Sequence, residues 1–245
     1  SVAGIMFYLI GYNLLYGIDE GGYLGSLSIW GGDDSALTAD TPDFSGGYST
    51  GSDWYFQMVF VATAASIVSG TVAERIKLWP FLGFVVLLTA FIYPIQASWV
   101  WGGGWLSAAG FSDFAGSTLV HSVGGWAALV GAILLGARAG KYGADGSVTP
   151  IPGSSMPLAT LGTFILWLGW FGFNGGSQLA LGSAIDAAAV ADIFINTNMA
   201  AAAGVVAAMI ATQLLYGKVD LTMALNGAIG GLVSITAEPL APSIG

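Results

Sequence analysis

The sequence predicts an all-α fold, a polytopic bundle of transmembrane helices. Hydrophobic residues make up 55% of the 245-residue chain, charged residues only 8%, and the mean hydropathy is +0.77. A soluble domain carries about a quarter charged residues, so this chain has too few charges to cover a water-facing surface. The apolar runs lack the strict alternation that marks membrane barrel strands, and we therefore expect helices.

Seven apolar runs are candidates for membrane helices, because a span needs about 20 mostly apolar residues. We expect them to form one partial transmembrane domain over residues 1–245, without a separate soluble domain. The predicted helices are Val2–Ile18, Asp53–Thr71, Leu78–Val100, Phe114–Leu135, Pro157–Gly176, Asp192–Tyr216 and Leu221–Ala237.

The positions of the basic residues predict the orientation. All five Lys and Arg residues fall on one side of a seven-helix zigzag, and that side is cytoplasmic by the positive-inside rule. The segment 19–52, rich in Gly, Ser and Asp, is then an exterior loop long enough to cover the mouth of a pathway. The basic residues are Arg75, Lys77, Arg138, Lys141 and Lys218.

Small residues at helical spacing predict close helix packing. Gly172 with Gly176, and Gly227 with Gly231, are four residues apart. Small residues let helix backbones approach each other in lipid. These pairs indicate a packed bundle and carry no functional information.

His121, the only histidine, is the strongest functional candidate, because ionisable residues inside a membrane are costly. It follows Asp113 by eight residues, which corresponds to a depth of about 12 Å at the helical rise. The hydrocarbon core is about 30 Å thick, so His121 is expected near the midplane. The alternative is a packed histidine bonded to a neighbouring carbonyl. Asp113 is expected to cap the start of this helix.

Aromatic residues are expected in two layers above His121. Phe56, Trp101 and Ser177 fall at the outer ends of three predicted helices. Phe60 and Phe173 lie one turn deeper, and Phe56 and Phe60 share a helix face. Aromatic faces attract a desolvated cation within about 6 Å, and a hydroxyl oxygen accepts a hydrogen bond from it. These residues could together attract a cation, although a Trp at the membrane boundary is by itself usually an interface anchor.

Four motifs together resemble the Amt/Mep/Rh ammonium transporters, in particular the Amt branch. The motifs are Asp113–His121 (DFAGSTLVH), Ala73–Ile76 (AERI), Trp101–Gly104 (WGGG) and Trp170–Ser177 (WFGFNGGS). The resemblance covers nearly the whole chain. It implies an incomplete ammonium-transporter fold with about seven of eleven helices, the second to the eighth, so that the chain is expected to be partial. The family's second pore histidine lies on a later helix.

The resemblance also implies a role for each candidate residue. It implies an outer ammonium-binding site, a phenyl gate, one pore histidine and one structural aspartate. The outer ammonium-binding site is expected at Phe56, Trp101 and Ser177, and the phenyl gate at Phe60 and Phe173. The pore histidine is expected to be His121, and the structural aspartate Asp113.

The resemblance implies transport without enzyme chemistry, cofactor, metal or nucleic acid. Expected partners are ammonium or ammonia, the lipid bilayer, two further copies in a homotrimer and a cytosolic P-II signalling protein. A multi-pass location in the plasma membrane is expected. The chain has no cysteine, which excludes thiolate metal sites.

Three alternative functions share some of these sequence features. An ammonium-sensing input domain of a larger signalling protein would have the same helices and stays open. A related Rh-type channel has a different outer site, and Trp101 with Ser177 favours the Amt branch. A microbial rhodopsin needs a lysine inside its last helix, whereas Lys218 precedes the last predicted helix here.

Overall fold

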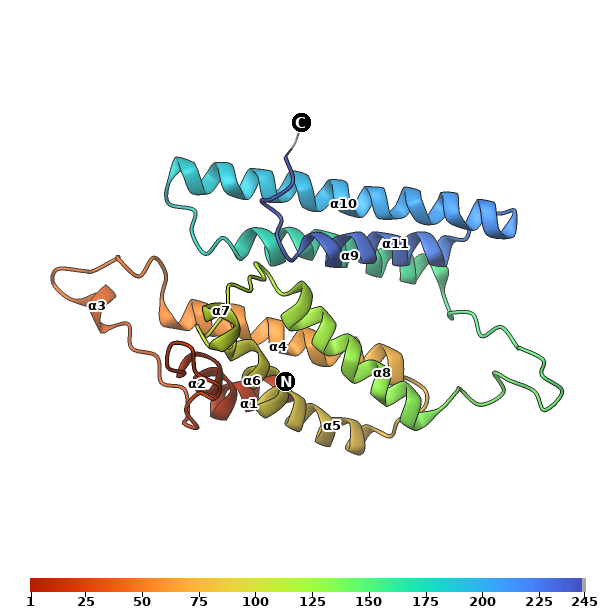
Figure 1. Cartoon of the computed structure of the whole chain (residues 1–245), viewed down its shortest axis with the longest axis horizontal. Helices are drawn as coiled ribbons and strands as arrows, with labels where there is room; N and C mark the ends of the chain where they lie inside the picture. The colour runs from red at the N-terminus through yellow and green to blue at the C-terminus, as the bar shows by residue number, and fades with distance from the viewer. Residues whose placement is uncertain (244–245) are drawn as a thin grey trace. The chain divides into compact units, whose positions relative to one another are not determined.

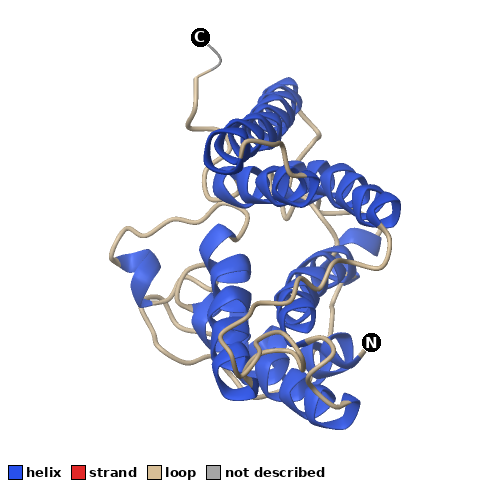
Figure 2. Ribbon diagram, turned by 90° about the vertical axis from the view of Figure 1, so that its right-hand side faces the viewer, coloured by secondary structure: helices blue, strands red, loops and turns tan. Residues whose placement is uncertain are grey.

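The computed structural model describes residues 1–243 and consists of helices and loops, with helices blue in Figure 2. Within these residues the only extended pairing is an isolated bridge between Tyr142 and Val148. The all-α prediction is confirmed. Ile244 and Gly245, the last residues of the predicted domain, lie outside the described residues. By length and composition, five helices within residues 1–243 are long and apolar enough to cross a membrane: Thr50–Val72, Leu78–Ser98, Ser117–Leu135, Met156–Gly176 and Ala184–Tyr216.

Two shorter apolar helices, Val2–Tyr16 and Leu221–Ile235, complete the set of seven that the sequence predicts. The chain divides into two compact units, which are described separately. Unit 1 comprises residues 1–112 and 118–150, and unit 2 comprises residues 113–117 and 151–245. The single transmembrane domain stays a prediction.

Unit 1 contains the first four apolar helices, and three of them include a π-helical turn, labelled η. A π-helical turn holds one more residue than an α-helical turn. Figure 1 labels the α-helices along the chain. The elements are α1 (Val2–Met6), η1 (Phe7–Gly11), α2 (Tyr12–Tyr16), α3 (Ser35–Thr38), α4 (Thr50–Val72), α5 (Leu78–Leu87), η2 (Leu88–Ile92), α6 (Tyr93–Ser98), α7 (Trp105–Ala108), η3 (Ser117–Ser122, whose first residue belongs to unit 2) and α8 (Val123–Leu135).

A cluster of buried apolar residues lies between α4, α5 and α8 in unit 1. Two glycines of α8 face α4 closely: a Cβ on Gly124 would lie 3.0 Å from the carbonyl oxygen of Ala64, and one on Gly131 would lie 2.9 Å from Cγ1 of Val72. The two helices therefore approach along several turns. The buried cluster consists of Ala65, Val68, Val72, Val85, Leu88 and Ala128.

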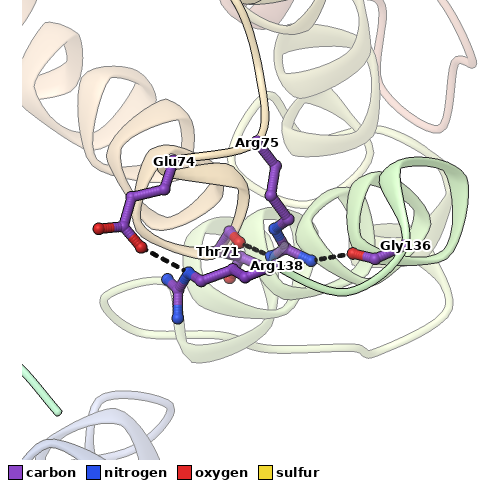
Figure 3. A network of polar contacts seen from close by, with 5 residues as sticks. All are labelled: Thr71, Glu74, Arg75, Gly136 and Arg138. Carbon is purple, nitrogen blue, oxygen red and sulfur yellow. Dashed lines mark hydrogen bonds and ion pairs between the residues drawn. The ribbon is translucent and has the colours of Figure 1, made fainter. Parts of the chain in front are cut away.

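Two arginines join the C-terminal ends of α4 and α8, as Figure 3 shows. Arg75 donates to the carbonyl oxygen of Gly136 at 2.5 Å and to that of Thr71. Arg138 pairs with Glu74 at 2.9 Å. Helix C-termini leave carbonyls without intrahelical donors, and a cation there also complements the helix dipole. We call these five residues the arginine clasp.

Part of the loop predicted to be exterior lies along the first helix. The side-chain amide of Asn13 donates to Oγ of Ser28 at 2.8 Å and to the carbonyl oxygen of Ile29 at 3.0 Å. The amide of Trp30 donates to the carbonyl oxygen of Tyr8 at 2.9 Å. These bonds hold residues 28–30 against the helix.

In its described residues, unit 2 contains the helices α9 (Met156–Gly176), α10 (Ala184–Tyr216) and α11 (Leu221–Ile235). In Figure 1, α10 and α11 lie side by side, and a Cβ on Gly204 of α10 would lie 2.0 Å from the carbonyl oxygen of Gly227. A Cβ on Gly231 would lie 2.1 Å from the carbonyl oxygen of Ala200. The packing predicted for the Gly227–Gly231 pair is confirmed, whereas Gly172 makes no such contact within unit 2.

Two predicted helix starts were wrong. The helix predicted from Asp192 begins at Ala184, because Oγ of Ser183 accepts the amide of Asp186 at 3.1 Å and caps the earlier turn. The helix predicted from Phe114 begins at Ser117. Gly116 has φ +97°, which interrupts the helical path just before it.

Candidate functional site

Three of the predicted site residues lie together in unit 1. The ring centroids of Phe56 and Phe60 are 4.7 Å apart, with an interplanar angle of 60°. The rings of Phe60 and Trp101 meet edge to face at 5.7 Å and 90°. Phe60 is only 1% exposed, and Phe56 and Trp101 are half-buried. The i, i+4 spacing on α4 places the two phenyl rings one above the other.

The turn after α6 fixes the position of Trp101. The amide of Trp101 donates to the carbonyl oxygen of Ala97 at 2.9 Å. A Cβ on Gly102 would lie 2.2 Å from the carbonyl oxygen of Leu15, so this turn packs directly on the first helix. Gly103 has φ +79°, a backbone conformation that glycine adopts without strain. The consecutive glycines thus hold the indole in place.

His121 is half-buried and lies in η3, the fifth residue from the start of the helix. The depth estimate counted helical rise from Asp113, whereas the helix starts at Ser117, four residues before His121. The position of His121 near the membrane midplane stays a prediction. The π-helical form of this turn was not predicted.

Asp113 is 3% exposed and lies in unit 2. Its Oδ1 accepts the amide of Gly116 at 2.9 Å and the amide of Ser117 at 3.0 Å. Next to it, the amide of Phe114 donates to the carbonyl oxygen of Ala237 at 2.7 Å. The carboxylate thus organises the turn that precedes η3 and anchors it beside the end of α11.

Ser177 and Phe173 lie at the end of α9 in unit 2. The Ser177 hydroxyl donates to the carbonyl oxygen of Phe173 at 2.8 Å. This bond uses the hydroxyl hydrogen, so the lone pairs of Ser177 Oγ remain available as acceptors for a cationic donor. The rings of Phe173 and Trp170 are 5.7 Å apart.

A chain of buried hydrogen bonds supports this end of α9. Trp170 Nε1 donates to Oγ1 of Thr236 at 2.8 Å, and that hydroxyl lies 3.1 Å from Oδ1 of Asn174. Asn174 Nδ2 donates to Oγ1 of Thr197 at 3.0 Å. The chain joins α9 to α10 and to the end of α11. The pairing of Phe60 with Phe173, and of Ser177 with Trp101, involves both units and stays a prediction.

Sequence reasoning missed two polar residues near the candidate site. Asp53 was counted as an exterior acid, yet it is only 9% exposed and accepts the Tyr12 hydroxyl at 2.5 Å. Burial, together with the Asp53 carboxylate, raises the pKa of Tyr48 in the adjoining loop.

Gln96 is the second polar residue that was missed. Its side-chain amide donates to the carbonyl oxygen of Leu119 in η3 at 2.8 Å. Its sequence signal was the single amide side chain in the apolar run Leu78–Val100.

The sequence is similar to those of known proteins. The sequence matches the model of the Ammonium Transporter Family over residues 1–241. It is 44% identical to the ammonium transporter Amt2 of Archaeoglobus fulgidus, covering 97% of this chain and 50% of that protein. It is 42% identical to the putative ammonium transporter sll1017 of Synechocystis sp., covering 96% and 52%. The chain spans about half the length of the curated relatives it matches.

Two solved structures have a similar fold. The structure named Sensor Amt Protein gives a TM-score of 0.84 at 38% identity, covering 98% of this chain and 57% of that one. Mep2 of Saccharomyces cerevisiae gives a TM-score of 0.80 at 27% identity, covering 97% and 51%. Both matches run through nearly the whole of this chain.

Proposed function

Because the chain belongs to the ammonium transporter family, we propose that it forms part of a pathway by which ammonium or ammonia crosses a membrane. The observation that carries the proposal is the aromatic group of Phe56, Phe60 and Trp101, with ring centroids 4.7 and 5.7 Å apart. Such a group offers aromatic faces at one level and a buried ring beneath them.

The outer step is recruitment of the cation. Ammonium exchanges part of its water shell for the faces of Phe56 and Trp101, which attract a desolvated cation through the ring quadrupole. The Ser177 oxygen accepts one N–H bond. Once desolvated, Na⁺ and K⁺ gain less there, because the bare ions have no hydrogen to donate to that oxygen.

The inner steps are a barrier and a relay. Phe60 and Phe173 form the proposed gate, which excludes bulk water. His121 lines the proposed path beyond it and hydrogen-bonds ammonia through an imidazole nitrogen. Asp113 supports this arrangement by organising the turn before the helix of His121.

The proposed setting is a single transmembrane domain that supplies the second to eighth helices of a longer transporter. The half-length coverage of the relatives supports this division. A homotrimer in the plasma membrane, with a P-II signalling protein docked on its cytoplasmic side, completes the proposal. No step requires enzyme chemistry.

A sensing role is the second candidate, and the likeness to Sensor Amt Protein at a TM-score of 0.84 favours it. In that case the same site would bind ammonium and report its presence to an attached signalling domain. Ammonium flux into vesicles containing the purified gene product separates the two. Binding without flux would favour sensing.

The test of the outer site is Trp101→Leu in the gene product that carries this chain, reconstituted in lipid vesicles. Loss of the indole face should raise the half-saturating ammonium concentration about tenfold, equal to about 1.4 kcal/mol, which lies between the values for exposed and desolvated cation–π contacts. Trp79→Leu is the control, because Trp79 is 79% exposed at the start of α5. Equal values for both variants would contradict the assignment of Trp101.

The test of the inner site is His121→Ala, measured as the ratio of ammonium to K⁺ flux. The proposal expects a lower ratio or a lower ammonium flux, with folding and assembly retained. A variant that fails to assemble would instead favour the purely structural histidine. A folded variant with unchanged flux and ratio would remove His121 from the pathway.

A further inference from the structure

The π-helical turn that carries His121 is bonded to a neighbouring helix through one side chain. Gln96 of α6 donates its Nε2 to the carbonyl oxygen of Leu119 at 2.8 Å and to that of Tyr93 at 3.1 Å. Leu119 lies in η3, two residues before His121. The two hydrogens of the amide thus serve two backbone oxygens, one in each helix.

The surroundings of Gln96 make this bond costly to break. Gln96 lines an apolar groove of about 560 Å³ between α4, α5 and α8. The other described residues that line it, such as Val123 and Ala127, carry apolar or aromatic side chains or are glycine. An amide beside such surfaces loses solvation unless it is hydrogen-bonded. The side chain is therefore held on the Leu119 carbonyl.

A side-chain donor at this position favours the wide turn over an α-helical one. A carbonyl oxygen has two lone pairs, so a side chain can bond it alongside the helical ladder. Side chains that insert into the i to i−4 ladder bend or widen helices, and π-helical turns are the usual single-turn form. The Gln96 bond adds such a side-chain donor to the carbonyl oxygen of Leu119 within η3.

The helix below the turn is already fixed. Gly124, three residues after His121, would bring a Cβ within 3.0 Å of the Ala64 carbonyl oxygen, so α8 lies directly on α4 at that level. This contact holds α8 against α4 just after η3. A change in the turn should therefore appear in the side chains that the turn carries, His121 among them.

We propose that Gln96 is a positioning residue for His121. By holding the Leu119 carbonyl, Gln96 keeps Ser117–Ser122 in the π-helical form and so sets the direction in which the imidazole points. The inference rests on the proposed function, in which His121 lines the ammonium pathway. Gln96 acts only through the backbone of η3.

The experiment uses Gln96→Met in the gene product that carries this chain, reconstituted in lipid with ¹⁵N-labelled histidine. Methionine has similar length and lacks both donors. Two quantities are measured on folded protein: the nitrogen resonances of His121, assigned by their loss in His121→Ala, and the ratio of ammonium to K⁺ flux. We expect shifted resonances and a ratio lowered about fivefold, equal to about 1 kcal/mol. Gln213→Met, an exposed site on α10, is the matched control.

Unchanged resonances together with an unchanged flux ratio in Gln96→Met would overturn the inference. If that variant does not fold, Gln96→Asn keeps the amide but is one methylene too short to reach Leu119, and the same two results decide. The proposed function fails separately. Shifted resonances in Gln96→Met, with normal flux in His121→Ala, would leave Gln96 as the positioning residue and remove His121 from transport.

Discussion

The α4–α8 pair of unit 1 and the α10–α11 pair of unit 2 are held together by different means. In unit 1, α4 and α8 meet through small apolar side chains, and the polar contacts of the arginine clasp lie at the partly exposed helix ends. In unit 2, α10 and α11 meet backbone to backbone. The chain of hydrogen bonds that runs from Trp170 through Thr236 and Asn174 to Thr197 is buried. Lipid removes most of the hydrophobic drive between helices, so close packing and internal hydrogen bonds must supply the association. Unit 2 uses both close backbone packing and hydrogen bonds in its interior. We therefore expect substitutions there to lower the free energy of unfolding more than substitutions at the α4–α8 contact.

The largest effect is expected from Gly227→Ala in unit 2. The new Cβ would lie 2.3 Å from the carbonyl oxygen of Gly204, so α10 and α11 must separate. We expect a loss of about 3 kcal/mol in the free energy of unfolding, at the upper end for overpacking. Unfolding in mixed detergent measures it. Gly230→Ala on the same helix is the control, because no atom lies within 4 Å of its Cβ position; similar losses in both variants would refute the backbone contact.

The next effect tests the buried hydrogen bonds. Thr236→Val removes the acceptor of Trp170 Nε1 and the partner of Asn174 Oδ1 while keeping the shape of the side chain. Leaving buried polar groups without partners should lower the free energy of unfolding by about 2 kcal/mol. Thr163→Val is the control, since its hydroxyl bonds a carbonyl of its own helix at 3.1 Å. A loss no greater than in this control would show that the buried bonds contribute little.

A smaller effect is expected at the corresponding contact of unit 1. In Gly124→Ala the Cβ would meet Ile67 at 2.9 Å and the Ala64 carbonyl oxygen at 3.0 Å, so a few tenths of an ångström of movement suffices. We expect a loss of about 1 kcal/mol, the lower end for overpacking. Gly125→Ala, with open space at its Cβ, is the matched control. A loss exceeding that of Gly227→Ala would reverse the comparison between the units.

The smallest effect is expected at the arginine clasp. The side chains of Arg138 and Glu74 are 38% and 68% exposed, and such ion pairs contribute about 0.5 kcal/mol or less. Glu74→Gln and Arg138→Gln, alone and combined, give the coupling energy at low salt, which should vanish at high salt. A coupling that survives high salt would mean that the pair is more shielded from solvent than its exposure indicates.

The sequence allowed the helices to be predicted because their signal is long and additive. Each apolar run sums the hydropathy of many residues, and the same spacing argument placed Phe56 and Phe60 on one face of α4. The early start of α10 was missed because Asp186 and Asp192 interrupt its first turns. There a single cap from Ser183 decides where the helix begins.

The π-helical turns and the Gln96 contact could not be predicted for a different reason. A π-helical turn differs from an α-helical one by a single residue, and composition does not register so small a change. The bond from Gln96 to Leu119 joins positions 23 residues apart, and only packing brings them together. Asp53 shows the same limit, because its contact with Tyr12 spans 41 positions.

The wide turn at Ser117–Ser122 also bears on how this chain can change in length. A segment with one residue more than an α-helix needs can lose that residue without breaking the helix that follows. Deleting Val120 would return the turn to α-helical geometry and leave Gly124 seated on α4, because the π-helical turn already accommodates the extra residue. The turn therefore allows the length of the segment before it to change without changing the helical register of α8. Insertions and deletions there should be tolerated by α8, whereas within α8 they would move Gly124 and Gly131 off α4.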